Sequence, residues 1–218
     1  MFAKLILPLV FFAALVAGAP SQCNPTRASP DLPAGQTTLV APNLPVKFVT
    51  LGVGIQNYTC SSTTLTYTSI GAIASIFDIS CLEGTVGFDT LQEYAFDVWS
   101  EEKGLGLVDG IGPLFGASRK LGNHFFVTSP SGTGISAEWD FSSSLGPGTS
   151  SFVIASKIAD LVAPKNPSVN VDWLELAQLK GTLATNVFRI DTVGGQPPTS
   201  CKAGSSISVK YVAKYWFY

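Results

Sequence analysis

The chain has 218 residues, of which 46% are hydrophobic and 13% are charged, and its formal net charge is −2. This composition is typical of a folded globular protein and excludes a disordered tail or a coiled coil. Without a surplus of basic residues or a run of like charges, the sequence also argues against binding to nucleic acid or to an anionic membrane.

The first residues have the pattern of a secretory signal peptide. Lys4 precedes an apolar stretch over residues 5–16, and small residues follow up to Ala19. This stretch is shorter than the about 20 residues that a membrane-spanning helix needs, so a membrane anchor is the weaker alternative. We therefore predict a signal peptide over residues 1–19 and a single secreted, β-rich domain over residues 20–218 with no membrane anchor.

All four cysteines follow the predicted signal peptide. An even number in an exported chain favours two disulfide bonds, for which three pairings exist. Cys60 and Cys81 are 21 residues apart on what read as adjacent strands, so we expect them to pair and to leave Cys23 with Cys201. The chain has a single histidine and no Cys-x-x-Cys pattern, so we expect neither a metal site nor a cofactor.

One sequon is open to N-linked glycosylation. It begins at Asn57, in Asn-Tyr-Thr, whereas the other two candidates carry the forbidden proline. A glycan at Asn57 would place this stretch on the surface.

Most of the chain reads as short strands, because β-branched and aromatic runs are bounded by glycine, proline and serine. The predicted strands cover residues 46–55, 70–79, 124–128, 152–158, 183–191 and 207–217. One segment, Phe88–Trp99, has helical spacing of its apolar residues, with Asp89 placed to cap its start. Residues 104–116 and 142–151 are typical of surface loops. The pattern predicts a mainly β fold, either an antiparallel β-sandwich or a partly closed barrel, with one short helix.

Nucleophilic catalysis normally needs a histidine base, and the single histidine is His124. No Gly-x-Ser-x-Gly motif accompanies it. Three roles stay open for His124: a structural hydrogen bond beside two phenylalanines, a ligand contact, or a catalytic base.

A pair of carboxylates could instead cleave a glycosidic bond without a histidine. Asp172 with Glu175 or Asp191 is the pair that this alternative would use, with His124 as a helper. Solvated or turn-capping acids are the simpler explanation of the same residues.

Large aromatic residues offer a further candidate site. Trp139 and Trp173, if exposed, would form a stacking platform for sugar rings, whereas burial in the core is the alternative. Asp172 lies beside Trp173, and Arg189 begins a segment that leads from a strand into a glycine-proline turn.

Six ordered blocks of the sequence together carry a family resemblance. They are residues 52–60, 77–81, 122–126, 171–174, 189–201 and 211–218. The sequence resembles a family of secreted fungal and bacterial proteins classed as a domain of unknown function. Fungal members are often labelled malate dehydrogenase, but the predicted signal peptide and the missing Gly-x-Gly-x-x-Gly motif oppose that activity here. The resemblance implies an extracellular, β-rich, disulfide-bonded domain and transfers no catalytic residue.

Low charge, predicted export and the lack of a recognisable catalytic set favour a non-catalytic extracellular binding protein. Its expected partner is a cell-wall polysaccharide, a host surface component or a small molecule. The alternative is a carboxylate-dependent hydrolase or lyase that acts on polysaccharide. The candidate ligand-binding residues are His124, Trp139, Asp172, Trp173 and Arg189.

Overall fold

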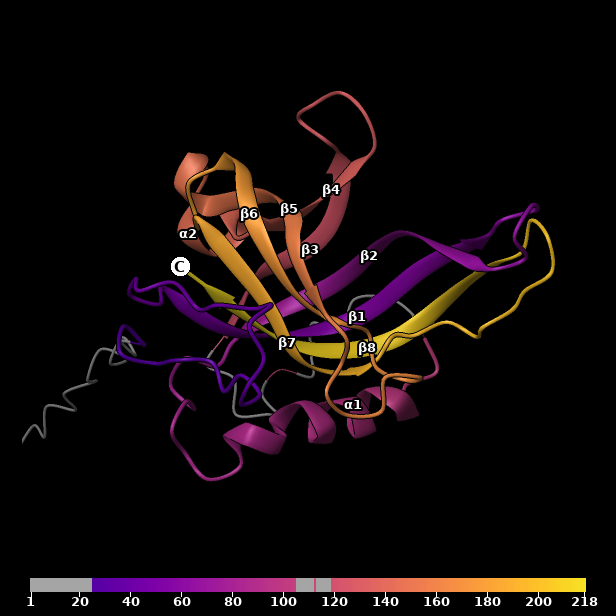
Figure 1. Cartoon of the computed structure of the whole chain (residues 1–218). Helices are drawn as coiled ribbons and strands as arrows, with labels where there is room; N and C mark the ends of the chain where they lie inside the picture. The colour runs from indigo at the N-terminus through magenta and orange to yellow at the C-terminus, as the bar shows by residue number, and fades with distance from the viewer. Residues whose placement is uncertain (1–24, 105–111, 113–118) are drawn as a thin grey trace, which may run out of the picture.

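The computed structural model describes residues 25–104, 112 and 119–218. Within these residues, eight antiparallel strands follow one another in chain order, and the last pairs with the first (Figure 1). The sheet therefore closes into a barrel. The strands are β1 (Phe48–Cys60), β2 (Tyr67–Asp78), β3 (Arg119–Thr128), β4 (Ile135–Asp140), β5 (Phe152–Leu161), β6 (Trp173–Gly181), β7 (Asn186–Gly194) and β8 (Ser206–Phe217).

The prediction of a mainly β fold with one short helix is confirmed, and of the two architectures the barrel is the one that forms. The stretch 142–151, predicted as a loop, contains the short helix α2 (Ser142–Leu145) and the 3-10 turn η3 (Thr149–Ser151). The predicted signal peptide and most of the predicted loop 104–116 lie outside the described residues. No helix in the part of the chain that the structure describes has the length and apolarity needed to cross a membrane.

Aromatic side chains fill the interior of the barrel at the end where β1 begins. Trp139, Phe141, Tyr215 and Phe217 each expose no more than 1% of their surface. Their rings meet edge to face, with the centroids of Phe141 and Phe217 5.3 Å apart. Gly52 makes room for this cluster, because a Cβ atom there would lie 2.5 Å from Cε2 of Tyr215. This end of the barrel is therefore closed by packed side chains.

The helix α1 (Leu91–Glu101) covers the outer wall of the barrel across β7, β8 and β1 (Figure 1). Leu91, Ala95 and Trp99 recur every four residues, which places them on one face of the helix. All three are buried against outward-facing side chains of the barrel. Nε1 of Trp99 also donates a 2.8 Å hydrogen bond to the carbonyl of Gly54, which ties the helix to β1.

The predicted capping role of Asp89 is wrong. Asp89 lies inside a 3-10 turn, η1 (Phe88–Thr90), which precedes the helix. The helix therefore begins two residues after Asp89, and Thr90 occupies the N-cap position without making a side-chain cap. Sequence periodicity locates the helix but does not distinguish its first turn from a 3-10 turn.

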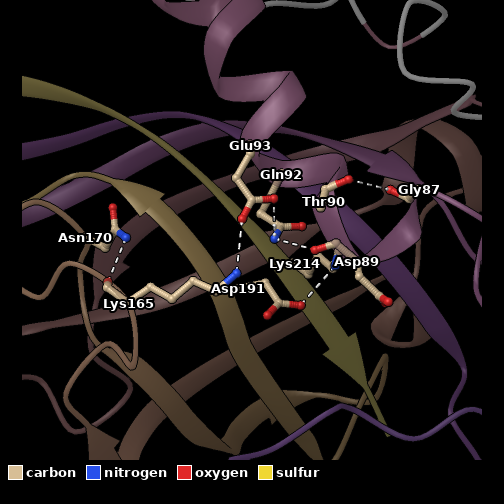
Figure 2. Close-up of polar contacts among 9 residues, drawn as sticks. All are labelled: Gly87, Asp89, Thr90, Gln92, Glu93, Lys165, Asn170, Asp191 and Lys214. Atoms are coloured by element: carbon tan, nitrogen blue, oxygen red, sulfur yellow. Dashed lines mark hydrogen bonds and ion pairs between the residues drawn. The ribbon is translucent and has the colours of Figure 1, made fainter.

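Two ion pairs lie where the helical segment meets the barrel, one between β7 and β8 and one that reaches the helix (Figure 2). Nζ of Lys214, which is 1% exposed, lies 3.0 Å from Oδ2 of Asp191 and 4.2 Å from the ring centroid of Phe88. A more exposed pair joins Lys165 to Glu93 of the helix at 3.4 Å. The first pair joins β8 to β7, and its lysine is covered by Phe88 while Asp191 keeps 23% of its side chain exposed.

The predicted disulfide pairing is wrong, because Cys60 is bonded to Cys201. Cys60 ends β1, whereas Cys81 follows β2, which runs back along β1, so that Ile79 donates a hydrogen bond to the carbonyl of Val49. Cys60 and Cys81 thus lie at opposite ends of the barrel. Cys81 is also disulfide-bonded, and Cys23 lies outside the described residues.

Candidate functional site

The barrel is hollow at the end opposite the aromatic cluster. A cavity of about 360 Å³ lies where the β1–β2, β3–β4, β5–β6 and β7–β8 connections meet. Exposed residues such as Ser69, Ile135 and Lys157 stand around it, so the cavity opens to solvent. Its volume lies within the range of pockets that hold small molecules, which is roughly 300–1,000 Å³.

One wall of the cavity is polar. It is formed by Gln56 and Tyr58 of β1, Asp172 just before β6, Arg189 of β7, and Gln196 of the β7–β8 connection. Inward positions alternate along a strand, which is why Gln56 and Tyr58 share this wall while Asn57 between them faces outward.

Apolar side chains line the cavity along the strands β3 to β6. They are Phe126 of β3, Ala137 of β4, Ala155 of β5, and Leu174 and Leu176 of β6, and the same strands also contribute Ser136, Ser156, Lys157 and Asp160. The two alanines leave room where larger side chains would fill the barrel. The cavity therefore combines hydrogen-bonding groups with apolar side chains in one lining.

Arg189 is held by the main chain of the β5–β6 connection. Its Nε and Nη2 atoms donate hydrogen bonds of 3.1 and 2.8 Å to the carbonyl of Asp172. Burial raises the pKa of the Asp172 carboxyl, and the neighbouring Asp160 carboxylate raises it further. Asp160 is itself in an ion pair with Lys157 at the mouth of the cavity.

Tyr58 ties β1 to the β7–β8 connection. Its hydroxyl donates a 2.7 Å hydrogen bond to the carbonyl of Gly195, next to Gln196. Burial raises the pKa of Tyr58 to about 12, so the phenol stays neutral at physiological pH. The hydrogen bond from Tyr58 to Gly195 thus helps to position Gln196, which completes the polar wall.

Gln56 lines the cavity and has an unpartnered donor in its side chain. Its side chain is 5% exposed, and its Nε2 atom is buried with no hydrogen-bond partner among the described residues. A buried amide without a partner costs about 1–3 kcal/mol. Oε1 of Gln92, Oδ1 of Asn123 and Nε1 of Trp216 are likewise buried without a partner among the described residues, but none of these residues lines the cavity. Nε1 of Trp139 is also buried and unpartnered, but Trp139 does not line the cavity.

His124 lies beneath the floor of the cavity, not in its wall. Its ring is stacked on Trp139 with centroids 4.4 Å apart, and it contacts the ring of Phe126, which does line the cavity. Nδ1 lies 2.8 Å from the carbonyl of Glu138, and since a carbonyl only accepts, Nδ1 carries the proton. Burial lowers the pKa of His124 to about 4, so the ring is neutral at physiological pH.

This buried histidine predicts a loss of stability in acid. The unfolded chain takes up a proton at His124 below pH 6.5, whereas the folded chain does so only near pH 4, so acidification favours unfolding between these values. We expect the contribution of His124 to fall by about 3 kcal/mol between pH 7 and pH 4. Denaturant unfolding of wild type and His124→Phe across this range measures it. Parallel pH profiles for the two proteins would contradict it, since the variant removes only this titration from the total.

The structure brings some of the predicted residues together and separates others. Asp172 and Arg189 line the cavity, and His124 and Trp139 lie under its floor. Trp173 faces the outer wall and packs in the cluster that α1 covers. Trp139 and Trp173 are 1% and 8% exposed, so no tryptophan platform forms on the surface.

The carboxylates proposed as an acid and base pair do not share a site. Glu175 alternates with the inward Leu174 and Leu176, and it accepts a hydrogen bond from Asn186 on the outer wall. Asp191 lies under the helical segment with Lys214. Asp172 is thus the one member of that set at the cavity, and no group of three or more His, Cys, Asp or Glu side chains gathers anywhere in the described residues.

Sequence reasoning missed several cavity residues, namely Gln56, Tyr58, Phe126, Asp160 and Gln196. One signal was present for Gln56. It is a polar residue at the end of an apolar, β-branched run, and the even positions Gly52, Gly54, Gln56 and Tyr58 lie on one face of the strand.

The comparisons with known proteins give a family and no function. No curated protein and no solved structure matches the chain. The family described as "Protein of unknown function (DUF3455)" matches residues 40–218, a range that includes every strand of the barrel and the helix α1. The chain therefore belongs to the DUF3455 family of proteins of unknown function.

Proposed function

We propose that the protein is a secreted, non-catalytic binding protein that holds a small molecule in the open end of its barrel. The observation that carries this proposal is the open cavity, whose lining includes Gln56, a residue with a buried amide nitrogen that lacks a partner. A turn of the Gln56 side chain toward an acceptor atom of a ligand would satisfy this donor. The cost of leaving it unpaired is then offset whenever the cavity is occupied.

The arrangement of the cavity supports binding over the alternative of polysaccharide cleavage. That alternative pairs Asp172 with Glu175 or Asp191, and those two acids belong to the outer wall. His124, its proposed helper, is 3% exposed and sealed behind Phe126. We therefore favour a role in which the cavity retains its ligand unchanged.

An extracellular location is supported by the cysteines. The described residues contain no free cysteine, and disulfide bonds persist in oxidising compartments. The predicted signal peptide over residues 1–19 and the predicted glycan at Asn57 agree with this location. Asn57 faces outward, and its Oδ1 accepts a hydrogen bond from Ser208. A mature protein recovered from culture medium that still begins at Met1 would contradict this proposal.

Filling the cavity tests the binding role. Ala155 is 1% exposed and lines the apolar wall, so Ala155→Phe places a ring in the cavity. Ala177 is next along β6 from the inward Leu176 and faces outward, so Ala177→Phe is the matched control. In a thermal-shift panel of neutral small molecules, a ligand at 100 times its Kd should raise Tm by about 5 °C or more for wild type and for the control.

The same ligand should leave the melting temperature of Ala155→Phe unchanged. If Ala155→Phe does not fold, Ala137→Leu is the second variant, because it also reduces the volume of the cavity but adds a smaller side chain. Compounds that stabilise all variants equally, or a panel without a single stabilising compound, would contradict a binding site in the barrel.

A further inference from the structure

We infer that the ligand is a neutral sugar, bound as a free monosaccharide or as the terminal residue of a neutral oligosaccharide. This inference rests on the proposed binding function and names the chemical class that the cavity recognises. It follows from the charges of the cavity, its hydrogen-bonding groups, its apolar wall and its closed floor.

The charges of the cavity are already compensated within the protein. Lys157 pairs with Asp160, and the guanidinium of Arg189 donates to the carbonyl of Asp172, whose carboxyl lies close enough for the two charges to interact. The lining thus contributes two cationic and two acidic side chains. A charged ligand would lose its hydration in the cavity and would find no unpaired charge of opposite sign there. The site therefore favours a neutral ligand.

The hydrogen-bonding groups of the polar wall suit hydroxyls. The Nε2 atom of Gln56 lacks an acceptor, the amide of Gln196 offers a donor and an acceptor, and the carboxylate of Asp172 offers acceptors. A hydroxyl both donates and accepts, so a polyol satisfies such mixed groups where an ether or a hydrocarbon does not.

The apolar side chains of the lining suit the flat side of a sugar ring. A pyranose has C–H groups on its faces and hydroxyls around its rim, so it needs one apolar surface and a set of polar partners at its edge. Phe126, Leu174 and Leu176 supply that surface, and Arg189, the cross-strand partner of Leu174, supplies a polar group at its edge. An aromatic face such as that of Phe126 packs well against C–H groups.

The shape of the cavity limits the length of the ligand. Its floor is closed by Trp139, Phe141 and Tyr215, which are 1% exposed or less. A polymer cannot pass through the barrel, so only a chain end or a free sugar reaches Gln56. The predicted wall-polysaccharide partner would thus be recognised at its terminus.

Calorimetric titration with defined sugars tests the inference. The probes are glucose, mannose, galactose and N-acetylglucosamine, with glucuronic acid as the charged match of glucose and cyclohexanol as an apolar neutral ring. The proteins are wild type, Gln56→Leu and the matched control Gln178→Leu, whose residue is exposed on β6 and does not line the cavity. We expect at least one neutral sugar to bind, and glucuronic acid to bind at least about tenfold more weakly than glucose.

Gln56→Leu should weaken sugar binding about tenfold, while Gln178→Leu leaves it unchanged. Because the Gln56 donor is unpartnered in the free protein, Gln56→Leu should unfold at the same or a higher denaturant concentration than wild type. A purely structural glutamine would instead lower both stability and affinity.

Three results would overturn the inference. Tighter binding of glucuronic acid than of glucose would make the ligand anionic. Binding of cyclohexanol with no sugar binding would refute the sugar class while leaving the barrel as a binding site. Binding of no probe by wild type, together with no cavity-dependent stabilisation in the thermal-shift panel, would refute the proposed function as well.

Discussion

Replacing Asp191 by asparagine is expected to lower the free energy of unfolding by about 3–5 kcal/mol, because it leaves a buried ammonium without its carboxylate. Lys214 is 1% exposed, and Oδ2 of Asp191 lies 3.0 Å from its Nζ (Figure 2). Asp191 has a φ of 50°, a left-handed conformation that asparagine tolerates, so the substitution removes charge without adding backbone strain. Chemical denaturation of wild type and variant at neutral pH measures the loss.

A second substitution and a matched pair make this test specific. Lys214→Met in the Asp191→Asn background removes the stranded charge, so the double variant should be more stable than Asp191→Asn alone. Glu93→Gln removes the acid of the exposed pair with Lys165 and should cost under about 1 kcal/mol. Equal losses for Asp191→Asn and Glu93→Gln would show that burial of Lys214 does not make its ion pair with Asp191 more important for stability than the exposed pair.

Replacing both Cys60 and Cys201 by serine is expected to destabilise the protein by about 4 kcal/mol, since the bond closes a long loop in the unfolded chain. The two cysteines are 141 residues apart in sequence, with Cα atoms 5.8 Å apart. The bond joins the β1–β2 hairpin to the β7–β8 connection, where Cys201 also donates a backbone hydrogen bond to Leu65 (Figure 1). Equilibrium unfolding of the oxidised wild type and the double variant tests this expectation.

The same double variant probes the polar wall of the cavity. Gln196 reaches the cavity from the connection that the disulfide ties down. Loosening this connection should therefore weaken ligand binding even at temperatures where the variant is fully folded. A loss of stability below about 1 kcal/mol would mean that the tip of the hairpin is held by its backbone hydrogen bonds and not by the covalent bond.

Local pattern was enough to predict most of the strands but not the closure of the barrel. The strands β1, β2, β3, β5, β7 and β8 overlap predicted ones, because their apolar and β-branched residues form dense runs. The strands β4 and β6 were not predicted, since acidic and polar residues on their outer faces break up their apolar runs. Closure depends on the pairing of β1 with β8, whose partners such as Phe48 and Phe217 are far apart in sequence.

The site was predictable only in part for the same reason. Asp172 and Arg189 stood out by their neighbours in sequence, and both line the cavity. Gln56 and Gln196 line the same cavity only because the barrel brings β1 and the β7–β8 connection together. The predicted disulfide pairing was wrong because the adjacency of two strands does not tell at which end of the barrel each cysteine lies. A single sequence gives the face of a side chain but not the residues across the barrel from it.

The central claim is that a ligand occupies the barrel end and satisfies the Gln56 amide, and side-chain amide NMR tests it most directly. In ¹⁵N-labelled protein titrated with glucose and N-acetylglucosamine, the Nε2 protons of Gln56 and Gln196 should shift together as the sugar binds. The exposed amide of Gln178, on β6 outside the cavity, should not move. Shifts confined to residues outside the cavity, such as the helical segment around Phe88 and Tyr94, would place the ligand elsewhere and contradict the account.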